Sequence, residues 1–447
     1  MRVAVIGTGH VGLVVAACLA HVGHDVVGMD DDAPTIAQLS RGEMPLYEPA
    51  LAPLVASSRA AGRLALTTDL RAAIRGRQVA FICVSTPVLP DGRPDLSAVE
   101  ATARRIAAAE PRDLLIVEKS TGPTNTAAWI ERTLAIYGGP GAREVEVASS
   151  PEFLRRGSAV HDCLHPDRLV VGVKSARAAQ RLRDLYAPIL EGRIACPFHE
   201  PCVAAVPPPF VATSFQCAEL IKHASDAFLA MKVSFINAVA DFCERVGADV
   251  LQVAEGIGLD PRIGPSFLQA GLGFGGSCFA KDTLAFLRLA EEQGVDLGLV
   301  REAHQINRRR VQVAVEKLRR ALWVLRGKRI GLLGLAFKPH TDDVREAPAL
   351  ALAARLIQEG AEVVGYDPQA GGAARAALPS LSLADDPYSL AQGAESLVLV
   401  TEWPEFLALD WGRLKQGMRR PVMLDGRNAL DREKLVAEGF EYLGMGR

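Results

Sequence analysis

Short apolar runs alternate with longer Ala-rich stretches along the N-terminal part of the chain. The runs VAVIG, DVVGMD, VAFICVS, LLIVEKS, EVEVASS and RLVVGV are typical of strands, and the first stretch between them has a helical pattern as far as Ala20. Strands that alternate with helices form parallel sheets, because each parallel connection crosses the sheet through a helix. The pattern therefore predicts a parallel α/β sheet.

The apolar pattern breaks between about Ile194 and Thr213, where PFHEPCVAAVPPPF introduces prolines that cannot donate backbone hydrogen bonds. We interpret this segment, which includes a Pro-rich excursion over residues 196–210, as a linker or surface excursion. Residues 214–246 contain neither Pro nor Gly and carry apolar residues at helical spacing. They predict one long helix that ends at Gly247. Because apolar residues surround much of this helix, it needs more than one packing partner, and we expect at least a homodimer.

A second αβ pattern begins near Lys328 with KRIGLLGLAF and continues through EVVGYDP, SLVLVTEW and PVMLDGRN. It predicts a second doubly wound sheet. The glycines of GLLGLAF lack the spacing of a dinucleotide loop, so this half is expected to hold a different nucleotide or none. The predicted fold class is α/β, with two doubly wound Rossmann-like domains joined by a long central helix. The expected domains cover residues 1–212, 213–322 and 323–447.

Composition limits the partners of the protein. The chain has 447 residues, of which 23% are charged, and its formal net charge of -2 lacks the positive excess with which proteins bind nucleic acid or anionic membranes. No apolar run reaches the roughly 20 residues that span a bilayer, and we expect a cytoplasmic protein. The eight cysteines show neither CxxC pairs nor His-rich spacing, so neither a disulfide framework nor a metal site is expected.

The motif GTGHVG follows the first strand directly and precedes a helix. Gly7 permits a tight turn, Gly9 lets the backbone approach a pyrophosphate, and Gly12 permits close packing of helix and sheet. Asp30 ends the second strand at about the 20-residue offset of a carboxylate that binds a ribose 2′-OH and repels a 2′-phosphate. The motif predicts NAD as cofactor; the alternative is a glycine turn without a cofactor. The apolar N-terminus is accordingly interpreted as structure and not as a signal peptide.

A glycine-rich segment from Gly273 to Asp282, GFGGSCFAKD, carries a single cysteine. Glycines let the backbone approach a ligand, and the charge of Lys281 favours an anionic partner or a thiolate. Cys278 is therefore a candidate nucleophile, and a small buried cysteine beside a helix start is the alternative. Further polar residues follow predicted strands, at the edge where ligands bind in such folds: Thr86, Lys119, Glu152, Lys338 and Arg427.

These motifs, together with GLAFKPHTDDVREAP, YEP at residues 47–49, KST at residues 119–121, PEFLRRGSAVHD, AELIKHAS and TEWPEF, make nearly the whole chain similar to the UDP-glucose/GDP-mannose dehydrogenase family. The resemblance implies two successive oxidations of a sugar-nucleotide C6 alcohol to a carboxylate, with two NAD⁺ and one cysteine. UDP-glucose is the expected substrate and UDP-glucuronate the product. A dehydrogenase for GDP-mannose or a UDP-N-acetylhexosamine, or a low-activity or non-catalytic paralog, is the alternative.

The resemblance also implies roles for individual residues. Cys278 is the expected nucleophile, Lys222 stabilises the oxyanion, Asp282 holds the water, and Thr121 and Glu152 order water in the same pocket. The expected cofactor contacts are Gly7, Gly9, His10, Val11, Gly12, Asp30, Thr86, Thr121, Lys281 and Arg345. The expected substrate contacts are Glu152, Phe153, Leu154, Lys222, Arg262, Phe267, Gly273, Phe274, Lys338 and Arg427. Arg262 is expected to reach the substrate of a neighbouring subunit.

One departure from the family pattern falls inside the expected catalytic site. Asp226 stands where the family usually has asparagine, four residues after Lys222 and hence on the same helix face. A carboxylate there opposes an oxyanion unless it is protonated, or it pairs with Lys222 and keeps that ammonium charged. We therefore expect a slower hemiacetal step. Ser150, Arg156, Gly122 and Ala280 are further departures, and they put the identity of the substrate in question.

Overall fold

The computed structural model describes residues 1–89, 92–139, 144–194, 196–198 and 207–447, and it describes no side chain for Ser277 and Cys278. The chain forms two compact units, Met1–Ser225 and Asp226–Arg447, and the division falls inside the long helix α9 (Phe215–Val246). Helix α9 confirms the long helix that the sequence predicts. The domain limits at residues 212 and 322 stay predictions.

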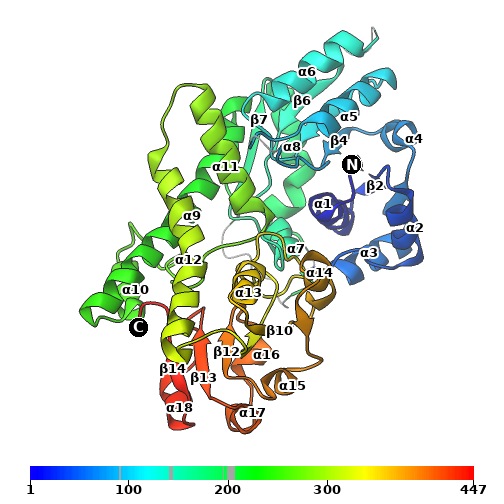
Figure 1. Cartoon of the computed structure of the whole chain (residues 1–447). Helices are drawn as coiled ribbons and strands as arrows, with labels where there is room; N and C mark the ends of the chain where they lie inside the picture. The colour runs from blue at the N-terminus through cyan, green and yellow to red at the C-terminus, as the bar shows by residue number, and fades with distance from the viewer. Residues whose placement is uncertain (90–91, 140–143, 195, 199–206) are drawn as a thin grey trace. The chain divides into compact units, whose positions relative to one another are not determined.

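The first unit is built on an eight-stranded sheet. Its strands are β1 (Arg2–Ile6), β2 (Asp25–Met29), β3 (Leu64–Thr67), β4 (Val79–Ile82), β5 (Leu115–Glu118), β6 (Glu146–Ser149), β7 (Leu169–Val173) and β8 (Phe210–Thr213). They lie in the order β3-β2-β1-β4-β5-β6-β7-β8. Figure 1 labels β2, β4, β6 and β7 of this sheet. The first six strands in this order have the 3-2-1-4-5-6 arrangement of a dinucleotide-binding fold.

Helices cover both faces of this sheet, because alternate residues of each strand point to opposite faces. Val3 and Val5 pack with α1 (His10–His21), α3 (Leu51–Ala60), α7 (Ala159–Leu164) and α8 (Ala176–Leu190). Ala4 and Ile6 pack with α4 (Leu70–Ile74), α5 (Ser97–Ala108) and α6 (Thr126–Tyr137). A further helix, α2 (Ala33–Arg41), follows β2. Burial on both faces explains why these strands are continuous apolar runs.

Two predictions about this unit are wrong in detail. The sheet is not wholly parallel, because β7 pairs with β6 in the antiparallel direction. The predicted linker does not reach Thr213, because Phe210–Thr213 forms the edge strand β8, paired in parallel with β7. The edge position accommodates the prolines that precede β8, because an edge strand bonds on one side only. Residues 199–206 of the Pro-rich excursion lie outside the described residues.

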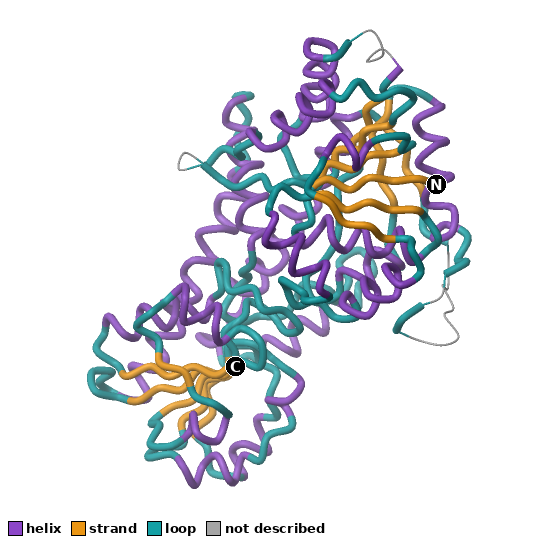
Figure 2. The backbone as a smooth tube through the Cα atoms, turned by 90° about the vertical axis from the view of Figure 1, so that its right-hand side faces the viewer, coloured by secondary structure: helices purple, strands orange, loops and turns teal. Residues whose placement is uncertain are grey.

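The second unit contains a six-stranded parallel sheet. Its strands are β9 (Arg329–Leu333), β10 (Glu362–Tyr366), β11 (Ser382–Leu383), β12 (Ser396–Leu399), β13 (Val422–Asp425) and β14 (Glu441–Leu443). Their order, β11-β10-β9-β12-β13-β14, repeats the 3-2-1-4-5-6 arrangement, and Figure 2 shows both sheets in orange. The fold class predicted from the sequence is therefore confirmed.

The helices of the second unit surround this sheet and extend beyond it. They are α10 (Val250–Gly258), α11 (Ser277–Glu292), α12 (Gly298–Leu322), α13 (Pro348–Gln358), α14 (Gly371–Ala377), α15 (Pro387–Ala391), α16 (Pro404–Leu407), α17 (Trp411–Gly417) and α18 (Arg432–Ala437). The C-terminal half of α12 joins α13 on one face of the sheet, where Leu318 and Leu352 share a core with Leu332. Within the described part of the chain, no helix is long and apolar enough to cross a membrane.

Candidate active site

The glycine loop after β1 has the geometry of a nucleotide cradle. Gly7 has φ +91°, and a Cβ there would lie 2.7 Å from the carbonyl oxygen of Cys83, which follows the neighbouring strand β4. A Cβ on Gly12 would lie 1.8 Å from the carbonyl oxygen of Gly7, whereas one on Gly9 would meet no atom within 4 Å. Gly7 and Gly12 are therefore required by packing. The open space at Gly9, directly before helix α1, fits a phosphate group.

Asp30 holds the same loop and keeps room for a ligand. Its Oδ2 accepts hydrogen bonds from the backbone N–H of Thr8 at 2.6 Å and the hydroxyl of Thr8 at 3.1 Å, and its Oδ1 accepts the N–H of Asp32 at 3.1 Å. A carboxylate offers about four lone-pair sites. One acceptor position on Oδ1 is therefore left for a ribose hydroxyl, and the residues present fit the adenosine side of NAD.

Asp367 occupies the corresponding position in the second unit, at the end of β10, but its acceptor sites are filled. Oδ2 accepts from the N–H groups of Leu335 and Ala336 at 2.7 and 2.9 Å and from the indole of Trp403 at 3.2 Å. Oδ1 accepts the N–H groups of Gln369 and Ala370. Five donors saturate this buried carboxylate, so it is a structural group and leaves no acceptor for a ribose.

Glu48, in the YEP motif, links the cofactor loop to the segment that follows Glu152. Its fully buried carboxylate bonds to Nε2 of His10 at 2.7 Å and accepts the N–H groups of Gly157 at 2.8 Å and Ala159 at 2.7 Å. His10 begins α1, and Val11 beside it packs against the apolar core of the unit. The sequence contained this motif but gave no role to Glu48, because its three partners lie up to 111 residues away.

Two further expected cofactor residues meet at the carboxyl ends of β4 and β5. The hydroxyl of Thr86 donates to the carbonyl oxygen of Thr121 at 2.8 Å. Next to Thr121, the imidazole Nε2 of His223 on α9 bonds to the carbonyl oxygen of Gly122 at 2.8 Å. Glu219, one turn earlier on α9, accepts the N–H groups of Asn125 and Ala127 at the start of α6. Helix α9 therefore fixes the loop that carries Thr121.

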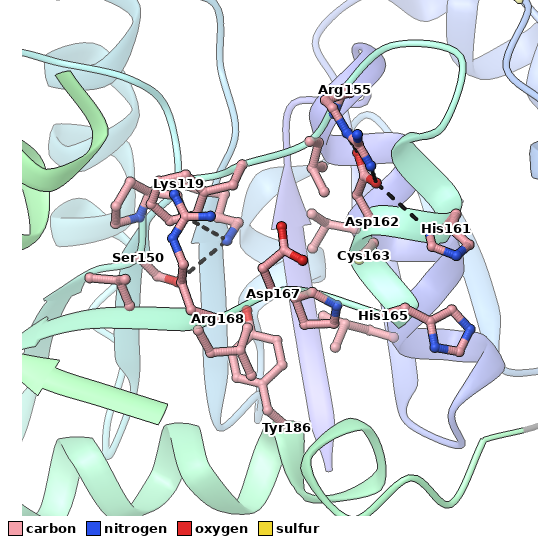
Figure 3. Close-up of a pocket in the computed structure, with 18 residues that line it drawn as sticks. Lys119, Ser150, Arg155, His161, Asp162, Cys163, His165, Asp167, Arg168 and Tyr186 are labelled. Atoms are coloured by element: carbon pink, nitrogen blue, oxygen red, sulfur yellow. Dashed lines mark hydrogen bonds and ion pairs between the residues drawn. The ribbon is translucent and has the colours of Figure 1, made fainter. Parts of the chain in front are cut away.

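A pocket of about 100 Å³ lies beside the expected substrate segment (Figure 3). Phe153, Leu154 and Arg168 are among its lining residues, and Figure 3 shows Lys119 next to Ser150. The ammonium of Lys119 lies 3.4 Å from Oγ of Ser150 and 3.3 Å from the carbonyl oxygen of Pro151. Burial lowers the pKa of Lys119. Lys119 therefore supports the backbone directly before Glu152.

Glu152 and Lys222 form a buried pair in the first unit. The Nζ of Lys222 lies 3.4 Å from Oε1 of Glu152, and the two side chains are 5% and 6% exposed. The N–H of Leu154 donates to Oε2 of Glu152 at 2.6 Å, which holds this carboxylate against the backbone of its own segment. The ring of Phe153 lies close to two cations, with Arg168 at 3.8 Å and Lys222 at 5.7 Å from its centroid. This arrangement presents an ammonium, a carboxylate and an aromatic ring at one place.

The cysteine segment, residues 271–283, belongs to the second unit. Gly276 precedes α11 with φ +87°, and Cys278 is the second residue of this helix, although its side chain lies outside the described part. One turn along α11, Asp282 is 1% exposed, and its Oδ1 lies 2.9 Å from Nζ of Lys281. The backbone of Cys278 thus lies in the first turn of α11.

Arg427 ties the cysteine segment to the edge of the second sheet. Its guanidinium donates to the carbonyl oxygens of Val400 at 2.6 Å, Gly273 at 3.0 Å and Phe337 at 3.3 Å. Lys338 follows Phe337, with its Nζ 5.8 Å from the centroid of that ring. Arg427, Gly273 and Lys338 are therefore neighbours, as expected of residues that share one ligand.

The remaining expected residues of the second unit have other surroundings. The guanidinium of Arg345 bonds to both oxygens of Asp343 at 2.9 and 2.8 Å. The side chain of Arg262, in the loop after α10, is 87% exposed and pairs with Asp260. Phe267 has φ +64°, and its ring lies 6.0 Å from that of Phe279. The side chain of Arg262 thus faces solvent in this structure.

Asp226 is 5% exposed on α9, one turn beyond Lys222, so both side chains belong to the same helix face.

In the described ranges, no group of three or more His, Cys, Asp or Glu side chains is arranged to hold a metal ion. The candidate catalytic groups of this chain are a buried lysine, carboxylates and a thiol. A lysine and carboxylates suit proton transfer and charge stabilisation, and a thiol suits covalent acyl chemistry.

Comparisons with known proteins agree with this arrangement. Residues 1–190 match the NAD binding domain of the UDP-glucose/GDP-mannose dehydrogenase family, residues 216–309 its central domain and residues 331–432 its UDP binding domain. A UDP-glucose 6-dehydrogenase of Rhizobium meliloti is 44% identical over 451 residues that cover 100% of both chains.

Two solved structures share the fold over the whole chain. A UDP-glucose dehydrogenase from the archaeon Pyrobaculum islandicum has 38% identity and a TM-score of 0.89, over 100% of this chain and 97% of that one. A UDP-D-ManNAc dehydrogenase from Pyrococcus horikoshii has 28% identity and a TM-score of 0.84, over 100% and 99%.

The glycine cradle, the acceptor left at Asp30 and the match of residues 1–190 confirm NAD as cofactor. Because all three family domains match in order and a relative is 44% identical over full length, the chain belongs to the UDP-glucose/GDP-mannose dehydrogenase family and is an NAD-dependent dehydrogenase.

Proposed function

We propose that the protein oxidises the C6 alcohol of UDP-glucose to the carboxylate of UDP-glucuronate in two NAD-dependent steps, with Cys278 as nucleophile. The observation that supports this most is the bond from Arg427 to the carbonyl oxygen of Gly273 at 3.0 Å. It joins the cysteine segment to the half of the chain that matches a UDP binding domain. A sugar nucleotide held by that half would therefore bring its sugar toward the thiol.

The proposed cofactor contacts surround the glycine loop. Gly9 leaves room for the pyrophosphate, Gly7 and Gly12 let the loop pack closely around it, and Asp30 accepts a ribose hydroxyl. Bound NAD⁺ supplies the hydride acceptor for each of the two oxidations. The remaining proposed contacts are His10, Val11, Thr86, Thr121, Lys281 and Arg345.

Cys278 is needed because an aldehyde has no hydroxyl hydrogen to lose with its hydride. The thiol sulfur bonds to the aldehyde carbon, and the carbonyl oxygen takes the thiol proton and becomes a thiohemiacetal hydroxyl. Loss of a hydride and of the hydroxyl proton leaves a thioester. Water then adds to the thioester carbon, the carbon–sulfur bond breaks, and the carboxylate, the free thiol and one proton are released.

Lys222 is the proposed partner of the oxygen that becomes negative during addition and hydrolysis. Its Nζ is buried and lies 3.4 Å from Oε1 of Glu152, which orients it. Asp282 is the proposed holder of the attacking water, and Thr121 and Glu152 are proposed to order water. Phe153, Leu154, Phe267, Phe274 and Lys338 complete the proposed substrate contacts.

The proposal includes a homodimer in which Arg262 reaches the substrate of the partner subunit. Three phenylalanines spaced seven residues apart along α9 support it: Phe228, Phe235 and Phe242 are 59%, 57% and 64% exposed. Residues at this spacing share one helix face, and an exposed aromatic row is typical of a surface that another chain covers.

Asp226 is proposed to slow the addition of the thiol. It is buried one turn from Lys222, where a carboxylate repels the developing oxyanion and an amide would donate to it. We therefore expect Asp226→Asn to raise turnover. An amide variant that is no faster and binds the sugar nucleotide no better contradicts this repulsion.

An NADH assay with a panel of sugar nucleotides tests the substrate. Two NADH per UDP-glucose support the proposal, and oxidation of a GDP-sugar or a UDP-N-acetylhexosamine in its place supports the alternative within the same family. That alternative has support from the similarity to the Pyrococcus horikoshii UDP-D-ManNAc dehydrogenase. No NADH with any member of the panel contradicts both and favours a non-catalytic sugar-nucleotide-binding protein, for which Asp226 is the main argument.

The covalent step is tested by Cys278→Ser, because a serine hydroxyl is a far weaker nucleophile at neutral pH. We expect this variant to lose formation of the acid. Cys217→Ser is the matched control, because Cys217 is exposed on α9, and it should retain full activity. Undiminished acid formation by Cys278→Ser would rule out covalent catalysis by this thiol.

A further inference from the structure

One row of polar side chains on α12 contacts the cysteine segment, which we define as residues 271–283. The row consists of His304, Asn307 and Arg310, and their spacing of three residues places them on one helix face. Each of the three bonds to a different part of the cysteine segment. The contacts fall on both sides of Cys278 in the sequence, and all of them lie within the second unit.

Arg310 holds the start of the segment. It is 0% exposed, and its Nε donates to the carbonyl oxygen of Gly271 at 2.9 Å. Its Nη1 donates to the carbonyl oxygen of Asn237 on α9 at 3.3 Å and forms an ion pair with Asp241. Asn237 completes the arrangement, because its Oδ1 accepts the N–H of Gly271 at 2.9 Å. Both backbone polar groups of Gly271 are therefore fixed by side chains.

Asn307 holds the middle of the segment through both ends of its amide. Its Oδ1 accepts the N–H of Phe274 at 2.8 Å, and its Nδ2 donates to the carbonyl oxygen of Phe274 at 3.0 Å. A Cβ on Gly273 would lie 2.4 Å from Oδ1 of Asn307, so the glycine is what lets this amide approach. The amide replaces a strand partner for Phe274, which lies outside the helices and strands.

His304 holds the segment beyond the cysteine. Its Nε2 is hydrogen bonded to the hydroxyl of Thr283, which also donates to the carbonyl oxygen of Phe279. Thr283 is 0% exposed and directly follows Asp282. The imidazole ring of His304 also lies edge-on to the ring of Phe274, with centroids 6.1 Å apart. One helix face therefore fixes the backbone four residues before Cys278 and the helical turn after it.

We propose that His304, Asn307 and Arg310 position the loop that carries the reactive thiol, and that Asn307 controls where Cys278 stands relative to the sugar. A glycine-rich loop has large conformational freedom, so it needs external hydrogen bonds to hold a nucleophile within reach of its target. A misplacement of about 1 Å can cost roughly 100-fold in rate. This inference rests on the proposed use of Cys278 in the second oxidation.

Asn307→Leu tests the inference, because it removes both hydrogen bonds and fills a similar volume. Arg309→Gln is the matched control, since Arg309 lies on the same helix but is exposed and pairs with Glu302. Hydrogen exchange of the Phe274 amide reports the clamp itself, and the number of NADH formed per sugar nucleotide consumed reports the second oxidation. If Asn307→Leu does not fold, Asn307→Asp replaces it, because it keeps the acceptor for the Phe274 N–H and loses only the donor.

We expect faster exchange at Phe274, turnover lowered by about tenfold or more, KM values within twofold of wild type, and fewer than two NADH per sugar nucleotide. A role in stability alone would reduce the amount of active enzyme and leave this ratio at two. Unchanged exchange, or faster exchange with an unchanged ratio and turnover, would overturn the inference. Full acid formation by Cys278→Ser would instead overturn the proposed function, and the exchange measurement would still test the clamp.

Discussion

The buried carboxyl of Glu118 should make the stability of the first unit depend on pH, so that the unit becomes less stable as the pH rises through neutrality. It is the last residue of β5, it is 2% exposed, and Oε2 accepts a hydrogen bond from the hydroxyl of Ser149 at 3.1 Å. Burial, with a smaller contribution from the charge of Glu219, raises the pKa of Glu118 to about 8 from the ordinary value of 4.5. The folded protein therefore holds a proton on Glu118 at pH 7, whereas the unfolded chain has released it.

The size of the effect follows from this difference in pKa. Between about pH 4.5 and pH 8 the folded state binds one proton more than the unfolded state. Across this range the free energy of unfolding therefore falls by about 1.4 kcal/mol per pH unit from its value below pH 4.5. Between pH 5.5 and pH 7.5 the loss amounts to about 2.7 kcal/mol, or roughly a hundredfold in the equilibrium constant for opening. Glu118→Gln mimics the protonated carboxyl and should remove this dependence.

Hydrogen exchange of the amides of β5 measures this free energy of opening locally. The ratio of protection factors, Glu118→Gln over wild type, should rise by about a hundredfold from pH 5.5 to pH 7.5. Glu100→Gln is the control, because Glu100 is exposed and pairs with Arg104 one turn away, and its ratio should not change with pH. A ratio for Glu118→Gln that is equally constant would refute the argument, since the carboxyl would then be ionised in the folded protein.

Three further predictions concern the cofactor loop, the link at Glu48 and the α9 surface. Gly9→Ala should keep the melting temperature of the wild type but weaken NAD⁺ binding measured by titration calorimetry, whereas Gly12→Ala should lower the melting temperature as well, because its Cβ would meet a carbonyl oxygen. Glu48→Gln should weaken both NAD⁺ and sugar-nucleotide binding by about tenfold, since an amide nitrogen cannot accept the N–H groups that the carboxylate holds, and Glu43→Gln, an exposed control, should weaken neither. Phe235→Glu should turn a dimer into monomers by light scattering, and an unchanged mass would contradict the use of this surface.

The cofactor loop could be predicted because its signals are local. Gly7, Gly9 and Gly12 stand at a fixed spacing between the first strand and the first helix, and Asp30 follows at the end of the next strand. The residues around Cys278 were harder to predict. Asn307 and Arg310 belong to a helix that reads as an ordinary charged surface, INRRRVQ, and only packing shows that Arg310 is fully buried while its neighbour Arg309 is exposed.

The sequence by itself determined the alternation of strands and helices, the long helix α9 and the NAD loop, because apolar periodicity and glycine geometry act over a few residues. Only the tertiary structure decided the antiparallel β7, the edge strand β8, the filling of Asp367 by five donors and the partners of Glu48. Each of these depends on hydrogen bonds between residues far apart in the chain. Many distant residues could bond to the same acceptor, and no local sequence pattern shows which of them does.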